Sequence, residues 1–382
     1  MILQGATVHV GDGTVLENCD VQVLQGKIAR VGQGLAREGQ QDPQEPVRDL
    51  AGKEVFPGFI DGNSFMGTQD MAYEAKDFNE NSHPVTPYLD IWHSIDPDEI
   101  MRQELYKAGV TSMVVAPANQ GLIGGNCAVV KTWGKNLNRM TVRRQVGLKG
   151  SVTEEVSKMF GKKGGPATRM AMITLLQEAF HRTDYGSDYR SQRTKEVMDA
   201  VREGEIPFVV AAATASEMTA VVEALAADFP NMRLGFALAY QAPKAAEALQ
   251  KAQAQVILGE LTHNSQAVAH QMDYSAFAEL DSQGVPVSIS LLSEDMMYGR
   301  ECMLWTASKL MQDRGDSEQV LRMLGANIAR FHGVDDRVGL VKPGLDADLL
   351  IYEGNPVAQV GAKLLETMID GEAVYTAPGW EG

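Results

Sequence analysis

Short apolar runs in the middle of the chain alternate with longer stretches in which apolar residues recur every three or four positions. The apolar runs are rich in β-branched residues, which predicts strands that are buried on both faces. The strands that we expect from this pattern cover residues 55–60, 112–116, 142–148, 208–213, 234–239, 256–258 and 287–291. An eighth strand is expected near residues 128–131, or as part of the 142–148 segment.

The stretches between these runs have an amphipathic period and predict helices, for example at residues 98–108, 167–180, 216–227 and 244–252. A polar and charged stretch at residues 185–195 predicts a flexible loop. Strands that alternate with helices in this way are typical of a parallel sheet. The pattern therefore predicts an α/β fold, a (β/α)8 TIM barrel, over residues 55–336.

Both ends of the chain have a different pattern, in which short strands alternate with turns. Strand-like segments lie at residues 6–10, 19–24, 27–31, 347–352, 366–369 and 372–375. Turn residues such as Gln25-Gly26 and Asp370-Gly371 separate them. We therefore expect residues 1–54 and 337–382 to build one small β-sandwich domain from both chain termini.

The composition limits the classes of partner. A formal net charge of −16 and an isoelectric point near 4.9 argue against nucleic acid or an anionic membrane surface. The three cysteines, Cys19, Cys127 and Cys302, are far apart and indicate neither a disulfide framework nor a thiolate metal site. The sequence shows neither a secretion leader nor a run of 18 apolar residues. These features predict a soluble cytoplasmic protein.

Several short segments resemble one enzyme superfamily, and together they span nearly the whole chain. They are Pro57-Gly58-Phe59-Ile60-Asp61, Ala108-Gly109-Val110-Thr111, Ile123-Gly124-Gly125, Gly147-Leu148-Lys149, Thr168-Arg169-Met170 and Lys342-Pro343-Gly344. On these residues the chain resembles the amidohydrolase superfamily, in its imidazolonepropionase-like and dihydroorotase-like branch.

The resemblance implies a barrel with a terminal β sandwich, and one or two divalent metals at the C-terminal mouth of the barrel. Such a metal activates a bound water and polarises a carbonyl, and thereby hydrolyses an amide or lactam. The implied ligands are a His-x-His pair on the first strand, a lysine or glutamate on a middle strand, histidines on the fifth and sixth strands and an aspartate on the eighth. The resemblance also implies a homodimer.

The positions that match these ligands carry other side chains. Asn63 and Phe65 replace the His-x-His pair, whose two imidazoles would share one face of a strand. Ala211 or Ala213 stands at the fifth-strand position, Leu238 at the sixth and Leu292 at the eighth. Lys149 is the one match that is kept. We therefore expect a degenerate member of the superfamily without a metal or another cofactor.

Other polar residues near the expected mouth are candidates for chemistry. Glu80, Lys149, Glu260 and His263 are the catalytic candidates, and the last two are close enough in sequence to act as an acid/base pair. The candidates for substrate binding are Asn63, His83, Arg169, Tyr240 and Glu294. Each also has a purely structural interpretation, such as a solvated loop carboxylate for Glu80 or an ion pair for Lys149.

Two functions of different class follow from these residues. The first is a pseudoenzyme that binds a small-molecule ligand or a partner chain, either as a homo-oligomer or with a paralogous chain. The alternative is a metal-independent hydrolase, or a related enzyme, that acts on a cyclic amide or another small carbonyl substrate at the barrel mouth. Apolar filling of the mouth by Phe65, Leu238 and Leu292 favours the first, whereas two convergent titratable groups would favour the second.

Overall fold

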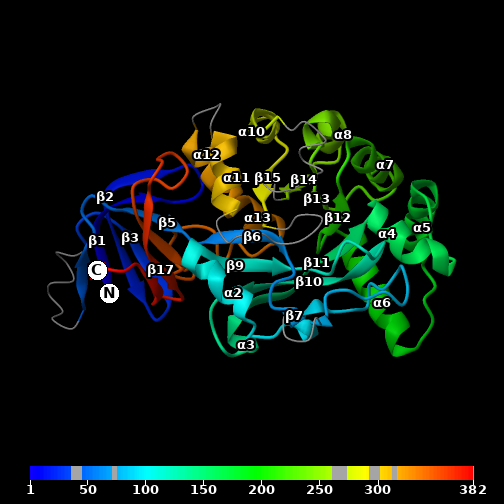
Figure 1. Ribbon diagram of the computed structural model, residues 1–382, viewed down its shortest axis with the longest axis horizontal. Coiled ribbons are helices and arrows are strands. Elements are labelled where there is room, and N and C mark those ends of the chain that lie inside the picture. The colour runs from blue at the N-terminus through cyan, green and yellow to red at the C-terminus, as the bar shows by residue number, and fades with distance from the viewer. Residues whose placement is uncertain (36–44, 71–74, 260–272, 292–301, 312–315, 382) are drawn as a thin grey trace.

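The computed structural model covers the whole chain. It describes residues 1–35, 45–70, 75–259, 273–291, 302–311 and 316–381. Figure 1 shows a β-rich part that contains both chain termini beside a larger part in which helices surround a second sheet. Among the described helices, none is both long enough and apolar enough to cross a membrane.

The β-rich part is one sheet built from both ends of the chain. Its strands are β1 (Ile2–His9), β2 (Val15–Leu24), β3 (Lys27–Gly32), β4 (Val47–Asp49), β5 (Glu54–Pro57), β16 (Leu349–Glu353), β17 (Lys363–Ile369) and β18 (Glu372–Thr376). Their order is β18-β17-β16-β5-β1-β2-β3, and β4 pairs with β1. The two ends of the chain meet where Val55 of β5 pairs with Ile351 of β16. The domain boundary predicted after residue 54 thus falls inside β5.

The larger part holds the second sheet of eight strands. They are β6 (Phe59–Ser64), β9 (Val110–Val115), β10 (Ile123–Lys131), β11 (Thr141–Ser151), β12 (Phe208–Ala212), β13 (Leu234–Leu238), β14 (Gln255–Leu258) and β15 (Val287–Ile289). Their order is β15-β14-β13-β12-β11-β10-β9-β6. Ser290 Oγ donates to the carbonyl oxygen of Asn63, so the first and last strands of this order lie side by side and the barrel is nearly closed. The predicted TIM barrel with a sheet from the termini is confirmed.

The expected first barrel strand at residues 55–60 is wrong in its extent, because Gly58 divides it. Residues up to Pro57 pair in the terminal sheet, and the barrel strand begins at Phe59. A Cβ atom on Gly58 would lie 2.0 Å from Thr111 Oγ1, so only glycine fits at this crossing between the sheets. The apolar residues of this run do not indicate that the chain passes from the terminal sheet to the barrel sheet at Gly58.

The eighth strand lies where one alternative placed it, but it does not run parallel to its neighbours. β10 pairs antiparallel with β9, where Val129 lies opposite Val114, and antiparallel with β11, where Asn126 lies opposite Leu148. The connections at residues 116–122 and 132–140 are shorter than the roughly twelve residues that a parallel crossover needs. The barrel therefore departs from the uniformly parallel pattern at this strand.

Helices cover the outside of the barrel, and short elements connect them. The α-helices are α2 (Ile100–Leu105), α3 (Leu137–Met140), α4 (Glu154–Phe160), α5 (Arg169–His181), α6 (Tyr189–Arg202), α7 (Ala215–Leu225), α8 (Ala246–Lys251), α10 (Ser275–Ser282), α11 (Cys302–Met311), α12 (Ser317–Met323) and α13 (Ala326–Phe331). The 3-10 helices are η1 (Ile91–Ser94), η2 (Tyr106–Ala108), η3 (Gly161–Lys163) and η4 (Ala242–Ala245), and β7 (Gln69–Asp70) pairs with β8 (Ala75–Lys76). The four helices expected from periodicity correspond to α2 with η2, α5, α7 and η4 with α8.

The flexible loop expected at residues 185–195 is wrong, because α6 begins at Tyr189. The side chain of Asp188 accepts a hydrogen bond from the backbone N–H of Ser191 and caps the helix. The first turns of α6 are polar because they face solvent, while Val197 and Val201 further along are buried. The charged first half of α6 therefore shows no amphipathic period in the sequence, although the helix buries apolar residues in its second half.

The interior of the barrel is mainly apolar. Its buried cluster includes Val114, Val129, Val209 and Ile257, together with Ile328 of α13, which closes the barrel opposite the strand C-termini. In neighbouring parallel strands, paired residues point to the same face of the sheet. Lys149 pairs with Val209, so the lysine belongs to this interior face.

A buried ionic network joins the two parts of the molecule. Lys131, the last residue of β10, is 1% exposed and donates a hydrogen bond to Asp348. Its Nζ also lies 3.0 Å from Asp346 and 3.4 Å from Asp370. Burial acts to lower the pKa of Lys131, but the nearby carboxylates outweigh this effect and raise it. The network therefore holds a charged lysine under the terminal sheet.

Candidate functional site

At the end of the first barrel strand, Asn63 is buried and Phe65, just after β6, is half-buried, and neither side chain is an imidazole. Phe65 stacks on Phe78 with 4.4 Å between ring centroids, so it anchors the segment that follows β8. Asn63 is 2% exposed, and its carbonyl oxygen accepts from Ser290 Oγ at 2.6 Å. Its side-chain amide has no hydrogen-bond partner among the described residues. The structure thus places Asn63 at the mouth, as expected for a ligand contact, and makes Phe65 a packing residue.

The fifth and sixth strands present only alkyl groups at the expected ligand positions. Ala211 pairs with Ser151 on one side and Ala237 on the other, which places it on the interior face. Ala213 and Leu238 are also buried. Leu238 has φ 69° and lies in the left-handed region, which non-glycine residues seldom adopt. Leu292, at the eighth-strand position, lies outside the described residues.

Lys149 is a fully buried amine close to the C-terminal end of β11. Its Nζ donates a hydrogen bond to Asn119 Oδ1, in the connection between β9 and β10. Over the described ranges, no carboxylate forms an ion pair with it. Burial lowers the pKa of Lys149 to about 8, and the opposing charge interaction with Cys127 only partly offsets this effect. The ion pair that was one interpretation of this residue is therefore not formed within the described ranges.

Asp61 joins the two strands that close the barrel. Its Oδ1 accepts from the backbone N–H of Leu291 at 3.0 Å and from that of Asn63 at 3.3 Å. Burial raises the pKa of Asp61 to about 6, although these hydrogen bonds act in the opposite direction. This carboxyl group replaces the missing strand pairing between β6 and β15, which gives it a structural role.

The donor groups that the described residues place at the mouth do not fit a divalent metal. Catalytic metals in such barrels are held by imidazole, carboxylate or thiolate groups. The described residues at the mouth offer an amide at Asn63, an amine at Lys149 and hydroxyls at Ser151 and Ser290. In the described part of the chain, no cluster of three or more His, Cys, Asp or Glu side chains could hold a metal ion.

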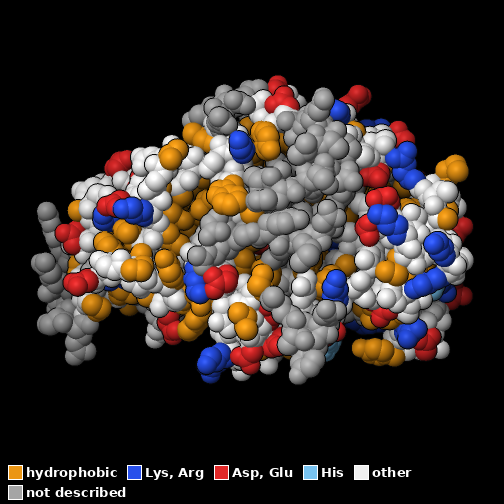
Figure 2. Space-filling view, viewed as in Figure 1, with side chains coloured by type: hydrophobic (Ala, Val, Ile, Leu, Met, Phe, Trp, Pro, Cys, Tyr) orange, Lys and Arg blue, Asp and Glu red, His pale blue; other side chains and the backbone are white. Residues whose placement is uncertain are grey.

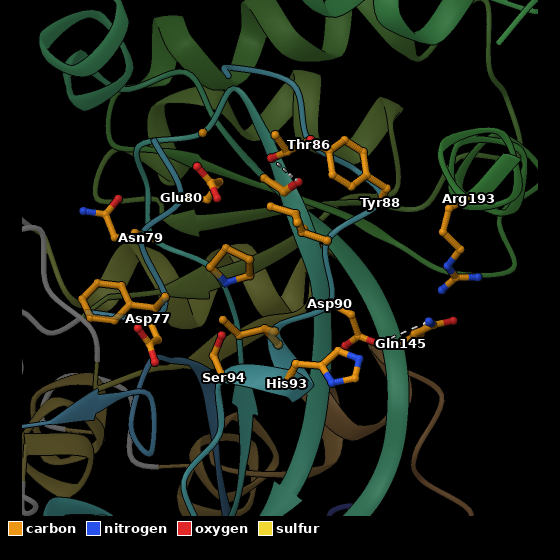
Figure 3. A pocket seen from close by; sticks show the side chains of 18 of the residues that line it. Asp77, Asn79, Glu80, Thr86, Tyr88, Asp90, His93, Ser94, Gln145 and Arg193 are labelled. Atoms are coloured by element: carbon orange, nitrogen blue, oxygen red, sulfur yellow. Dashed lines mark hydrogen bonds between the residues drawn. The ribbon is translucent and has the colours of Figure 1, made fainter. Parts of the chain in front are cut away.

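A cavity of about 770 Å³ lies on the flank of the barrel, outside the β10–β11 pair. We call it the flank cavity; it is bounded by residues 77–94, the β9–β10 connection, the first half of β11 and the start of α6. Figure 3 shows Glu80 and Arg193 on opposite sides of this space. Arg193 forms an ion pair with Glu196 at 2.7 Å. Arg144 donates to Asp90 at 2.7 Å and stacks on Trp92, so much of the lining is already paired.

Three of the described candidates, Glu80, His83 and Arg169, make their hydrogen bonds away from Lys149. Glu80 lines the flank cavity and accepts from the backbone N–H of Ser82, and this hydrogen bond lowers its pKa. His83 is exposed, and its ring contacts the backbone of Val85. Arg169 is exposed and donates to Ser216 Oγ at 2.7 Å, which ties α5 to α7. Each of these three contacts is structural.

The remaining candidates divide into one buried residue and three outside the described ranges. Tyr240 is 2% exposed and lies just after β13, which ends at Leu238. Glu260, His263 and Glu294 lie outside the described residues. The acid/base pair predicted for Glu260 and His263 therefore stays a prediction.

Two features of the site were missed at the sequence level. Asn119 gives no motif of its own, and its contact with Lys149 depends on how the β9–β10 connection folds. The flank cavity depends on the packing of α6, whose first half was expected to be part of a loop. Gly124 and Gly125 line it, and a Cβ atom on Gly125 would lie 2.9 Å from the carbonyl oxygen of Leu89. That pair of glycines therefore permits close backbone packing.

Charged side chains of both signs share the surface of the molecule. Figure 2 shows acidic and basic side chains interspersed on the face drawn there.

Residues 269–374 match the model of the amidohydrolase family. The amidohydrolase tasK of Hapsidospora irregularis is 23% identical over 412 residues, which cover 94% of this chain. This chain spans 40% of the length of that relative.

Solved structures share the architecture. An amidohydrolase from Thermotoga maritima MSB8 superposes with a TM-score of 0.85 at 24% identity, covering 98% of this chain and 100% of that one. Molinate hydrolase superposes with a TM-score of 0.55 at 15% identity, covering 97% of this chain and 94% of that one. The chain thus matches the amidohydrolase family model over residues 269–374 and shares its fold, over nearly its whole length, with the amidohydrolase from Thermotoga maritima MSB8.

Proposed function

We propose that this protein is a degenerate amidohydrolase of the imidazolonepropionase-like and dihydroorotase-like branch, whose barrel mouth binds a small molecule without metal-dependent hydrolysis. The observation that carries the proposal is the chemistry of the strand ends. Phe65 packs on Phe78, and the fifth and sixth strands present Ala211, Ala213 and Leu238. A neighbouring side chain can replace one lost metal ligand, but the simultaneous loss of the ligands on three strands removes the metal centre.

The mouth nevertheless keeps polar groups that a ligand can use. Lys149 has three N–H donors when charged and a single acceptor, Asn119, among the described residues. The amide of Asn63 has unused donors and acceptors there. Buried polar groups without partners favour a ligand that supplies them. This supports small-molecule binding over a mouth filled only by apolar side chains.

The proposal extends to assembly and location. The resemblance favours a homo-oligomer or an assembly with a paralogous chain. The acidic net charge disfavours nucleic acid as a partner. The three cysteines are buried and form no disulfide in the described part of the chain, which favours the reducing cytoplasm.

A second candidate function is a metal-independent enzyme that acts on a cyclic amide or another carbonyl compound. The observation that favours it is Lys149, since a buried amine without a counter-charge is a nucleophile or base near neutral pH. Glu80 does not share a site with it, because Glu80 lines the flank cavity.

Restoring only the first-strand pair tests the degenerate centre. The double variant Asn63→His with Phe65→His is expected to show no zinc-dependent turnover of lactams or cyclic imides, because the fifth-strand and sixth-strand positions still carry alkyl groups. The measurement is hydrolysis after zinc addition, with Phe65→His alone as the control for loss of the contact with Phe78. Zinc-dependent turnover by the double variant would sink the proposal.

A further inference from the structure

We propose that His9 is a proton-dependent clasp, which holds the terminal sheet against helix α12 of the barrel while its imidazole is protonated and releases α12 when the ring is neutral. The clasp consists of His9, Glu54 and Glu318. The inference is independent of what binds at the barrel mouth and of the metal content. It assigns a role to a buried histidine that does not line the flank cavity.

His9 is held between two carboxylates that come from different parts of the fold. It is the last residue of β1 and is 5% exposed. Its Nε2 lies 2.9 Å from Glu54 Oε2 on β5, and its Nδ1 lies 2.7 Å from Glu318 Oε1 on α12. The ring also stacks on Phe56, with 4.3 Å between ring centroids. One imidazole thus connects two strands of the terminal sheet to a helix of the barrel.

Only the protonated ring can make both contacts as hydrogen bonds. Imidazolium donates from both nitrogens, whereas the neutral ring has one donor and one acceptor. Loss of the proton therefore leaves one glutamate oxygen opposite a ring lone pair at hydrogen-bond distance, which is repulsive. Burial acts to lower the pKa of His9, but the hydrogen bonds and charges of Glu318 and Glu54 outweigh this effect and raise it. The geometry of the clasp thus selects the charged ring.

The two glutamates have no second cation that could replace His9. The side chain of Glu54 is 20% exposed and that of Glu318 is 16% exposed. Glu318 Oε2 is buried and has no hydrogen-bond partner among the described residues. In the same part of the chain, neither glutamate forms another ion pair. A neutral His9 therefore leaves poorly hydrated carboxylates without a cation.

Other charged groups on the elements around His9 have partners of their own. These pairs are Glu17 of β2 with Thr7 of β1, Asp12 after β1 with Lys342, and Arg322 of α12 with Asp281. Tyr352 of β16 lies edge-on to Phe56, and burial raises the pKa of its phenol, so it stays neutral. Among the described groups of this interface, His9 is therefore the one whose charge changes near neutral pH.

Release of α12 reaches the barrel because this helix packs on the strand that closes it. α12 contacts β15, and α13, which follows it, contacts both β15 and β6. The backbone N–H of Ile60 in β6 donates to the carbonyl oxygen of Leu324, directly after α12, at 2.8 Å. One side of α12 is thus attached to the first and last barrel strands, and the other side is attached to His9. The proton on His9 therefore sets how firmly the terminal sheet holds the closure of the barrel.

Hydrogen–deuterium exchange on the full chain tests the proposal. Exchange is measured at pH 6 and pH 9 and corrected for the chemical dependence of amide exchange on pH, and the protection of α12 is compared with that of α6. Because the pKa of His9 is higher in the folded chain, its stabilising contribution is present below pH 6.5 and is lost as the pH rises through the folded value. We expect the protection of α12 relative to α6 to fall roughly tenfold between the two pH values. Equal relative protection at pH 6 and pH 9 would overturn the inference.

Three variants assign this pH dependence to the clasp. His9→Gln keeps a side-chain N–H donor without the charge, so α12 is expected to have the same low protection at both pH values. Glu318→Gln removes the α12 end of the clasp and is also expected to abolish the pH dependence, which keeps the test decisive if His9→Gln does not fold. His181→Gln is the matched control, because His181 also contacts a carboxylate, Asp228 at 3.1 Å, but is 52% exposed. A pH dependence that persists in His9→Gln or in Glu318→Gln, or that is lost in His181→Gln, would contradict the inference.

Discussion

Replacing Lys131 with methionine is expected to lower the free energy of unfolding by about 3–5 kcal/mol, because it removes the cationic partner of the buried Asp348 carboxylate. Asp348 accepts a hydrogen bond from Lys131, and Asp346 lies 3.0 Å from its Nζ. Both carboxylates are buried; Asp346 keeps Arg337 and Lys27 as partners, but Asp348 has no other cation among the described residues, and water cannot reach it to replace the lost charge. The measurement is urea-induced unfolding of the variant and the wild-type chain at pH 7.

Lys158→Met is the matched control for this substitution. Lys158 also contacts two carboxylates, Glu154 at 2.7 Å and Glu155 at 2.8 Å, but its side chain is 57% exposed. Water and salt screen such a pair, so the control is expected to change the free energy by no more than about 0.5 kcal/mol. Equal effects at the two lysines would contradict the buried network.

Replacing Lys149 with methionine is expected to raise the free energy of unfolding at pH 7 by about 1–3 kcal/mol. The substitution removes a buried charge that has no carboxylate partner in the described ranges and fills the same space with an apolar chain. The loss of the hydrogen bond to Asn119 offsets part of this gain. A destabilised variant would show that interactions of the Lys149 amine compensate the cost of burying its charge.

The pH dependence gives the same test a second readout. The pKa of Lys149 is about 8 in the folded chain and 10.5 in the unfolded chain, so between these values the unfolded chain binds more protons. Wild-type stability relative to the methionine variant should therefore rise from pH 8 to pH 10.5, and the destabilising effect is complete below pH 8. The comparison is urea unfolding of both proteins at pH 7 and pH 10. A stability difference between the two proteins that does not change with pH would contradict the lowered pKa of Lys149.

The sequence predicts most of the fold because strands that are buried on both faces leave a clear apolar signal. Residues 208–213 and 234–239 lie almost where β12 and β13 form. The same signal cannot tell a parallel strand from an antiparallel one, so the direction of β10 depends on short connections instead. It also cannot show that Gly58 passes the chain from one sheet to the other.

The site is predictable where a motif fixes a position and unpredictable where tertiary packing decides. The signature at residues 57–61 places Asn63 at the end of β6, and the structure places it there. The partner of Lys149 comes from Asn119, in a connection without a motif, so whether the lysine is paired could not be predicted. The ring stacking of Phe65 on Phe78 likewise needs two segments that only the fold brings together.

The central claim is that the barrel mouth is not a metal centre. Its most direct test is the metal content per chain, measured by plasma mass spectrometry on protein purified without chelator and without a metal-affinity column. The account predicts zinc, manganese and iron far below one atom per chain, because the described strand ends carry amide, phenyl and alkyl groups. A content close to one or two atoms per chain would contradict it and would restore metal-dependent hydrolysis as the function.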